Sequence, residues 1–449
     1  MTTAPVTVLA ATALDSGNTA WLLAASALVL VMAPGLALFY GGMVRSKSVL
    51  NMMMMTFGSL AVISIVWVLV GYSLAFGDDL GLGLLGDPRQ YAGLGQLMGE
   101  QANGTSTVPV ILVAVFQGLF CVITGALVSG AIADRARFGA WLVFVTVWTL
   151  VVYAPVAHWV FDRSAPGHHG GWLLNRVGLV DFAGGTAVEI CSGASGLALA
   201  VVLGRRVGFG RDPMRPHNLT LVMLGAGLLW FGWFGFNAGS AAGAGQGAAV
   251  VFTDTLLAGA AGALGWLLLE RLRDAHATSL GAASGMVAGL VAITPSCGSL
   301  SPVGAITVAA VAGVVCALAV GLKYRLRLDD SLDVVGVHLV GGLVGTLGVG
   351  VLATAAAPTG VDGLLHGGGA GQLGRQLVGA GVVLVYAFTM SGIIGLALQR
   401  LMGFRVDEEH EVSGIDLVVH AETAYDLHST AGARSAGTGV LHIHREERR

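Results

Sequence analysis

The segment D-F-A-G-G-T-A-V-E-I-C-S-G-A-S-G, residues 181–196, begins at Asp181 and carries a second acid, Glu189, about two turns into an otherwise apolar helix. Ionisable side chains at membrane depth are costly and are usually retained for a transport path or a partner. The segment D-S-L-D-V-V-G-V-H-L-V-G-G-L-V-G, residues 330–345, repeats the pattern, because its first Asp precedes His338 by the same eight residues that separate Asp181 from Glu189. We therefore expect His338 to be the partner of Glu189.

Glycines extend the match between the two segments. One glycine follows each ionisable residue by four positions and another by seven, which gives Gly193 and Gly196 in the first segment and Gly342 and Gly345 in the second. Two such segments, about 150 residues apart, indicate an internal repeat with a site at its interface. The alternative is a purely structural Glu–His hydrogen bond.

The composition is that of a polytopic membrane protein. Of the 449 residues, 55% are hydrophobic and 11% are charged, whereas globular chains carry about 25% charged residues. The 69 glycines allow helices to approach one another closely. The four cysteines are scattered, with no C-x-x-C and no Cys/His cluster at ligand spacing. We expect no disulfide, metal, cofactor, nucleic-acid partner or enzyme activity.

Eleven apolar segments of roughly membrane-spanning length predict an all-α fold. They lie near residues 20–44, 49–76, 107–131, 139–161, 181–203, 218–238, 250–269, 278–296, 302–322, 332–353 and 376–402. One set of alternating loops holds most basic residues: Arg45, Lys47, Arg135, Arg137, Arg205, Arg206, Arg211, Arg215, Arg271, Arg273, Lys323, Arg325 and Arg327. The other set holds only Arg89, Arg163, Arg176 and Arg375. The positive-inside rule therefore places the N-terminus outside and the C-terminal tail in the cytoplasm.

This orientation puts Asp181 at the outer end of its span and Asp330 at the inner end of its own. The two repeats, residues 20–203 and 218–353, then have inverted topology, with five spans each and a final helix at 376–402. We expect an extracellular N-terminus at 1–19, a membrane domain at 20–402 and a cytoplasmic regulatory tail at 403–449. Residues 1–18 contain no Lys or Arg, so no cleaved signal peptide is expected. An Asp at a helix start also caps free N–H groups, and we favour this role for Asp181 over ligand contact.

Aromatic side chains form two clusters that suit a path for a small cation. Phe116 and Phe120 share one helix face, while Trp233, Phe236 and Ser240 lie on successive turns of the sixth span. Aromatic faces attract a cation by about 0.5–2 kcal/mol each, and a hydroxyl can accept its hydrogen bond. The alternative is ordinary core or lipid-facing packing.

Five motifs in order resemble the ammonium transporter, methylammonium permease and Rhesus protein family over nearly the whole chain. They are F-Q-G-L-F at 116–120, D-F-A-G-G-T at 181–186, W-F-G-F-N-A-G-S at 233–240, T-P-S-C-G at 294–298 and D-V-V-G-V-H at 333–338. The resemblance implies a homotrimer of eleven-helix subunits, each with an apolar pore that conducts ammonium or ammonia. It implies that Phe120 and Phe236 stack as an outer gate below a recruitment site with Phe116 and Ser240. Trp233, Glu189 and His338 would line the lumen, and Asp181 would order the vestibule.

Two positions depart from the family pattern. Glu189 stands where most members carry the first of two luminal histidines, although some fungal members also have Glu there. Phe161 stands where the family has its outer Trp, and an insert at 162–171 separates it from Trp172, so either residue can supply the outer ring. His168 and His169 in this insert are expected to be solvated.

The tail from Phe404 to Asp426 resembles the family's cytoplasmic segment, which packs under the pores and helps dock a trimeric PII-type signal protein. The alternative is a solvated charged tail, and the Ser/Gly/Ala-rich end after Leu427 is expected to be disordered. The resemblance implies ammonium uptake at the cytoplasmic membrane. An ammonium sensor with little transport and an electroneutral ammonia channel are the alternatives. Family sensors carry an appended signalling domain, and only about 45 residues follow the last span, which favours transport.

Overall fold

The computed structural model describes residues 13–99 and 107–425, and over these residues the fold is helical, with isolated bridges in place of β-strands. In this described part of the chain, ten helices are long and apolar enough to cross a membrane, and the shorter apolar helix Ser279–Ile293 (α10) completes the eleven predicted segments. The ten are Ser16–Met43 (α1), Val49–Phe76 (α2 to α3), Val110–Ile132 (α4 and a 3-10 turn), Phe138–Phe161 (α5 to α6), Gly185–Leu203 (η6 and α7), Leu219–Gly239 (α8), Gln246–Asp274 (α9), Pro302–Leu326 (α11), Val335–Leu352 (η7 and α12) and Gly371–Leu401 (α13).

Within these spans, α2 is Val49–Val66, α3 is Tyr72–Phe76, α4 is Val110–Val128, α5 is Phe138–Trp148, α6 is Ala154–Phe161, α7 is Cys191–Leu203 and α12 is Val340–Leu352. Four of the helices begin at capping side chains that each accept the backbone N–H three residues on, which satisfies one of the free donors of the first turn. These caps are Asp15, Asn218, Thr278 and Ser301.

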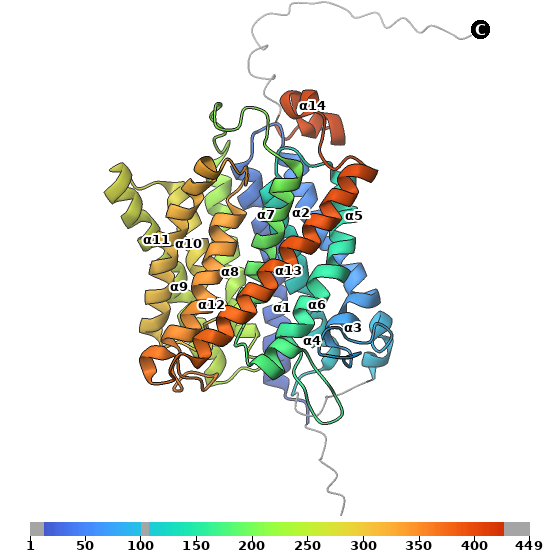
Figure 1. The fold of residues 1–449 in the computed structure, drawn as a ribbon, viewed down its shortest axis with the longest axis vertical. Helices are drawn as coiled ribbons and strands as arrows, with labels where there is room; N and C mark the ends of the chain where they lie inside the picture. The colour runs from blue at the N-terminus through green and yellow to red at the C-terminus, as the bar shows by residue number, and fades with distance from the viewer. Residues whose placement is uncertain (1–12, 100–106, 426–449) are drawn as a thin grey trace, which may run out of the picture.

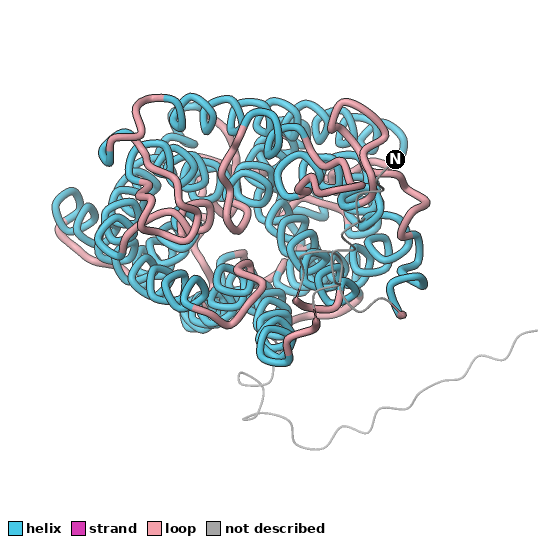
Figure 2. Tube along the Cα trace, turned by 90° about the horizontal axis from the view of Figure 1, so that it is seen from below, coloured by secondary structure: helices cyan, strands magenta, loops and turns pink. Residues whose placement is uncertain are grey.

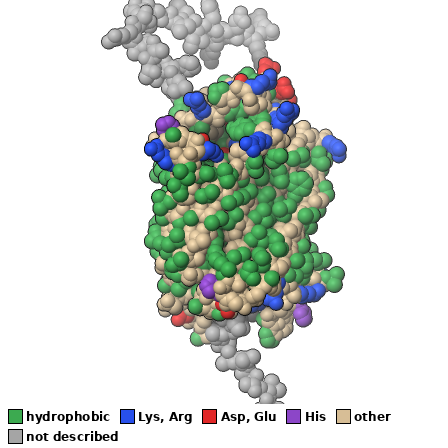
Figure 3. Space-filling view, turned by 60° about the vertical axis from the view of Figure 1, so that its left-hand side comes forward, with side chains coloured by type: hydrophobic (Ala, Val, Ile, Leu, Met, Phe, Trp, Pro, Cys, Tyr) green, Lys and Arg blue, Asp and Glu red, His purple; other side chains and the backbone are tan. Residues whose placement is uncertain are grey.

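The helices form one bundle, and its two ends differ in charge. The first turn of α1 and the last turn of α13 lie at opposite ends, and α13 runs obliquely across the front of the bundle (Figure 1). Figure 2 looks along the bundle and shows the helices nearly end-on. Hydrophobic side chains cover the middle of the molecule, while Lys and Arg gather mainly at the end that carries the tail (Figure 3). We call this end the inner end and the opposite end the outer end, following the charge distribution in the loops.

The two repeat segments cross each other in the middle of the bundle. Each begins with a π-helical turn, η6 (Gly185–Ile190) or η7 (Val335–Leu339), and these turns carry Glu189 and His338. A Cβ on Gly193 would lie 2.5 Å from the backbone nitrogen of Leu339, and one on Gly342 would lie 2.9 Å from the Cβ of Glu189. The glycines four residues after each ionisable group therefore permit the crossing, as the repeat predicts.

The tail packs under the bundle through some of its residues, although Asp407, Glu408, Glu409 and Glu422 are exposed. Phe404 is fully buried. Glu411, in the short helix α14 (Glu408–Ser413), accepts the N–H of Val207 at 2.7 Å. The carboxylate of Asp416 accepts the N–H groups of Leu50 and Asn51 at 3.0 and 2.8 Å and so caps α2. The disorder expected after Leu427 and most of the N-terminal segment lie outside the described residues.

Candidate functional site

Each repeat segment is held at its start by an aspartate cap. The Asp181 carboxylate accepts four backbone N–H groups, from residues 184 to 187, at 2.7–3.1 Å. The Asp330 carboxylate accepts two, from Val334 at 3.0 Å and Val335 at 2.7 Å. Both oxygens of Asp181 are thus used by the backbone, which is the capping arrangement expected for it. The caps fix the π-turns and with them the positions of Glu189 and His338.

Glu189 and His338 meet in the core of the bundle. The Nδ1 of His338 lies 2.7 Å from Oε2 of Glu189, and the two residues are 3% and 1% exposed. Both line a small cavity of about 10 Å³, room for about one water-sized molecule. The other lining groups are apolar or aromatic, and they include Trp233 and Phe236. We call this cavity the lumen.

Two stacked rings close the lumen toward the outer end. The centroids of Phe120 and Phe236 are 3.9 Å apart, with 10° between the ring planes. Phe116 packs on Phe120 at 4.9 Å. On the far side of the stack lies a second cavity, of about 600 Å³, which we call the outer mouth. Phe116, Phe120, Ser240 and Asp181 are among its lining residues, so the residues expected from the sequence line two cavities separated by the ring stack.

Phe161, not Trp172, supplies a further ring beside this stack. Phe161 lines the outer mouth and meets Phe120 edge-on, with centroids 6.5 Å apart at 89°. Trp172 instead packs against Trp159 at 6.2 Å. Of the two candidate rings, the structure therefore places Phe161 and not Trp172 in the lining of the outer mouth.

Sequence reasoning missed two polar partners of the path. The indole N–H of Trp233 donates to Thr294 Oγ1 at 2.8 Å, which fixes the orientation of the luminal ring. Gln117 lines the outer mouth, and its buried Oε1 has no hydrogen-bond partner within the described part of the chain. Thr294 belongs to the T-P-S-C-G motif and Gln117 to the F-Q-G-L-F motif, but the sequence pattern alone assigns neither residue a role.

The expectation that His168 is solvated is wrong. Its ring nitrogens lie 2.7 Å from Asp78 Oδ1 and 2.9 Å from Asp162 Oδ1, so it ties the 162–171 insert to the preceding outer loop. These two carboxylates raise the pKa of His168 to about 9, and burial raises the pKa of Asp162. His158 lies 3.3 Å from Asp162 Oδ2 and adds to the same contact. We call His158, His168, Asp78 and Asp162 the outer clasp.

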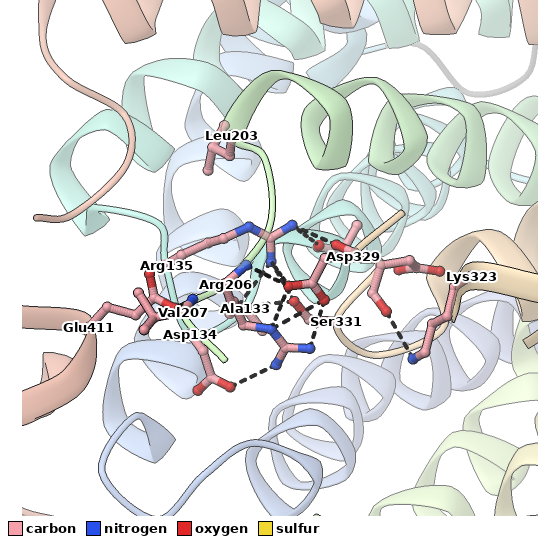
Figure 4. A network of polar contacts seen from close by, with 12 residues as sticks. Ala133, Asp134, Arg135, Leu203, Arg206, Val207, Lys323, Asp329, Ser331 and Glu411 are labelled. Carbon is pink, nitrogen blue, oxygen red and sulfur yellow. Dashed lines mark hydrogen bonds and ion pairs between the residues drawn. The ribbon is translucent and has the colours of Figure 1, made fainter. Parts of the chain in front are cut away.

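At the inner end, a network of ion pairs and hydrogen bonds joins the loops (Figure 4), and the rings of Phe209 and Tyr324 stack with centroids 5.6 Å apart. Arg206 donates to Asp329 at 2.8 Å and to Asp134 at 2.9 Å. The fully buried Arg135 donates to the carbonyl of Asp329 at 2.6 Å. The sequence places both arginines in the basic loops. In the structure their charges are balanced by Asp134 and Asp329, so they have a structural role. A cavity of about 320 Å³ lies beside them, lined by Arg206, Phe209, Gly210, Arg211, Asp212, Pro213, Met214, Lys323, Tyr324 and Ser331; we call it the inner mouth.

This arrangement can discriminate between charged and neutral species. An apolar lumen disfavours a bare cation, whereas a neutral molecule of similar size crosses at lower cost. The Glu–His pair at the lumen can hold a proton between its members. No group of three or more His, Cys, Asp or Glu side chains in residues 13–99 and 107–425 is arranged to hold a metal ion.

Comparisons with known proteins identify the family of the chain. A model of the Ammonium Transporter Family matches residues 20–425. An ammonium transporter of Mycobacterium tuberculosis H37Rv is 54% identical over 440 residues, which cover 93% of this chain and 92% of the relative. One of Corynebacterium glutamicum is 45% identical, with 93% and 91% covered.

Two solved structures give the same result at the level of the fold. Saccharomyces cerevisiae Mep2 superposes with a TM-score of 0.79 at 35% identity, covering 89% of each chain. A protein described as Sensor Amt Protein superposes with a TM-score of 0.82 at 27% identity, covering 90% of this chain and 98% of the other. The chain therefore belongs to the ammonium transporter family, and it is a multi-pass membrane transport protein rather than an enzyme.

Proposed function

We propose that this protein takes up ammonium across the cytoplasmic membrane, with residues 1–19 outside, a transport domain at 20–402 and a regulatory tail at 403–449 inside. The uneven distribution of basic loop residues supports this orientation. The named relatives are ammonium transporters, which supports the substrate.

Recruitment occurs in the outer mouth. Ammonium lies over the faces of Phe116 and Phe120, where each ring attracts it by about 0.5–2 kcal/mol. Ser240 donates its hydroxyl to the carbonyl of Phe236 at 2.9 Å, so its oxygen is oriented to accept a hydrogen bond from the ion. Rings with centroids 3.9 Å apart leave no open channel, so Phe120 and Phe236 must swing apart during passage.

Beyond the gate, the lumen favours neutral ammonia over the cation. The proton that ammonium gives up is held or relayed by Glu189 and His338, because their side chains lie 2.7 Å apart and can share a proton. Potassium has no proton to release and is excluded. The observation that carries this proposal is that stacked rings separate a polar mouth from an apolar cavity lined by the Glu–His pair.

The test measures charge movement and ammonia flux together. Purified protein in proteoliposomes on a supported membrane should give a transient current after an ammonium pulse, and the same liposomes should take up ammonia. Flux without current would indicate an electroneutral ammonia channel. If both flux and current are absent, the result would indicate an ammonium sensor. The similarity to the structure described as Sensor Amt Protein motivates this alternative.

The assembly and partner are also proposals. A homotrimer follows from the family resemblance, and native mass spectrometry in detergent tests it. For a PII-type signal protein, the docked tail offers exposed apolar side chains: Val412, Leu417, Val418 and Val419. Leu417→Asp should abolish binding without unfolding the tail, since Leu417 is 62% exposed. Binding retained in a pull-down would contradict this docking surface.

A further inference from the structure

The outer mouth contains a positive charge on a route proposed for a cation. Of the described residues that line this cavity, Arg163 is the one Lys or Arg. Its side chain is exposed, and within residues 13–99 and 107–425 it makes no hydrogen bond or ion pair. An unpaired guanidinium at a cation entrance repels the cation, so Arg163 should affect how readily ammonium binds in the mouth.

The backbone on both sides of Arg163 is fixed. The carbonyl of Asp162 accepts the side-chain N–H of Asn175 at 2.9 Å, and the N–H of Ser164 donates to Asn175 Oδ1 at 2.9 Å. The N–H of Gly170 donates to Ser164 Oγ at 2.9 Å and closes the loop. These hydrogen bonds therefore hold the backbone of Arg163 at the outer mouth.

Two acids could neutralise Arg163: its neighbour in sequence and the acid that lines the mouth. Both carboxylates are bonded to other groups. Asp162, adjacent in sequence, is 4% exposed and directs both oxygens to His168, at 2.9 and 3.0 Å. Asp181, the acid that lines the outer mouth, uses both oxygens on backbone N–H groups. The charge of Arg163 is thus left facing the solvent of the mouth.

We propose that Arg163 is an electrostatic filter that lowers the occupancy of the outer mouth by ammonium and other small cations. It sets the concentration at which uptake is half-maximal and leaves the later steps unchanged. This inference rests on the proposed ammonium transport. A unit charge about 10 Å from a cation changes its occupancy about twofold in bulk water, and severalfold at the lower effective dielectric of a protein surface. Salt screens the effect, with a Debye length of about 10 Å at 0.1 M.

The experiment measures initial methylammonium uptake against concentration in cells that lack other ammonium transporters, suspended in isotonic sucrose at ionic strengths of roughly 10 and 300 mM. At low ionic strength, Arg163→Gln should lower KM about two- to fivefold with an unchanged maximal rate. Arg163→Lys should keep the wild-type KM. Arg176→Gln should also keep it, since Arg176 is an exposed outer residue outside the cavity lining.

A second measurement needs no variant. The KM of the wild type should itself fall when salt rises to about 300 mM, and it should then approach the KM of Arg163→Gln. Superimposable wild-type and Arg163→Gln curves would overturn the filter while leaving the proposed transport intact. A higher KM in Arg163→Gln would also overturn it, because Arg163 would then assist recruitment. Absence of saturable uptake by the wild type would overturn the proposed function and this inference with it.

Discussion

The segments 181–190 and 330–339 share a local structure but end in different surroundings. Each has an aspartate cap, a π-helical turn and an ionisable residue eight positions after the cap. The outer cap binds four amides beside a cavity of about 600 Å³, whereas the inner cap binds two amides close to an ion-pair network and a cavity of about 320 Å³. The comparison shows that a repeat fixes the geometry of the helix start, while neighbouring elements decide which groups surround it.

The largest expected effect is the loss of stability when either aspartate cap is removed, and its size should differ between the two caps. Asp181→Ala should lower the free energy of unfolding by about 3 kcal/mol and Asp330→Ala by about 2 kcal/mol, since each lost bond from a backbone N–H to a carboxylate costs about 1 kcal/mol and solvent in the outer mouth recovers part of the outer loss. Thermal unfolding midpoints in detergent measure both. Asn at either position keeps one acceptor oxygen and should restore about half. Equal losses would mean that the count of amides does not govern the difference.

The next change removes the outer gate, whose rings are buried and 3.9 Å apart, whereas the stacked rings of Phe209 and Tyr324 at the inner end are 5.6 Å apart. Phe236→Ala should open the route sterically yet reduce ammonium uptake at least about tenfold, or about 1.4 kcal/mol, because the rings strip and orient the cation. Phe231→Ala is the matched control, since Phe231 on the same helix is 54% exposed on the outside of the bundle. Uptake at the native rate by Phe236→Ala would contradict the gate assignment.

A third change tests the difference between the acid of the outer segment and the histidine of the inner one. Glu189→Gln keeps the shape and removes the charge, so we expect severalfold lower transport with a shifted pH dependence. Glu189→His should remain active with a different optimum, because it makes the two segments alike. Ammonium-induced currents from about pH 5 to 8 compare the three forms. If the native and Gln curves superimpose, the Glu–His contact is only structural.

The smallest effect concerns the outer clasp, which the inner mouth lacks. The pKa of His168 is raised to about 9 from an ordinary value of 6.5, so the charged imidazole stabilises the fold fully below about pH 6.5, and this stabilisation is lost as the pH rises through about 9. His168→Gln should therefore lower the unfolding temperature by a few degrees at pH 6 and by less at pH 9.5. His169→Gln, the exposed neighbour, is the control. A pH-independent loss would exclude the charge as its cause.

Much of the fold and part of the path could be predicted from the chain alone. Apolar segment lengths predicted the helices, because a bilayer dictates how many apolar residues a span needs. The repeated Asp, ionisable residue and glycines predicted that Glu189 and His338 meet, because a shared spacing on inverted helices brings equivalent positions to one depth. The role of Asp181 as a cap followed from its place at a helix start.

Only the tertiary structure decided which groups of different elements meet. Phe161 rather than Trp172 lies at the gate, and His168 lies between Asp78 and Asp162, because the path of the insert is set by its contacts with the preceding outer loop. Arg206 and Asp329 likewise form their pair between loops far apart in sequence. Local sequence determines helix starts, spans and the spacing along one helix, since these depend on the backbone and the membrane. Contacts between loops depend on where the helix ends lie after the helices have packed. The spacing of residues along the chain does not specify those positions.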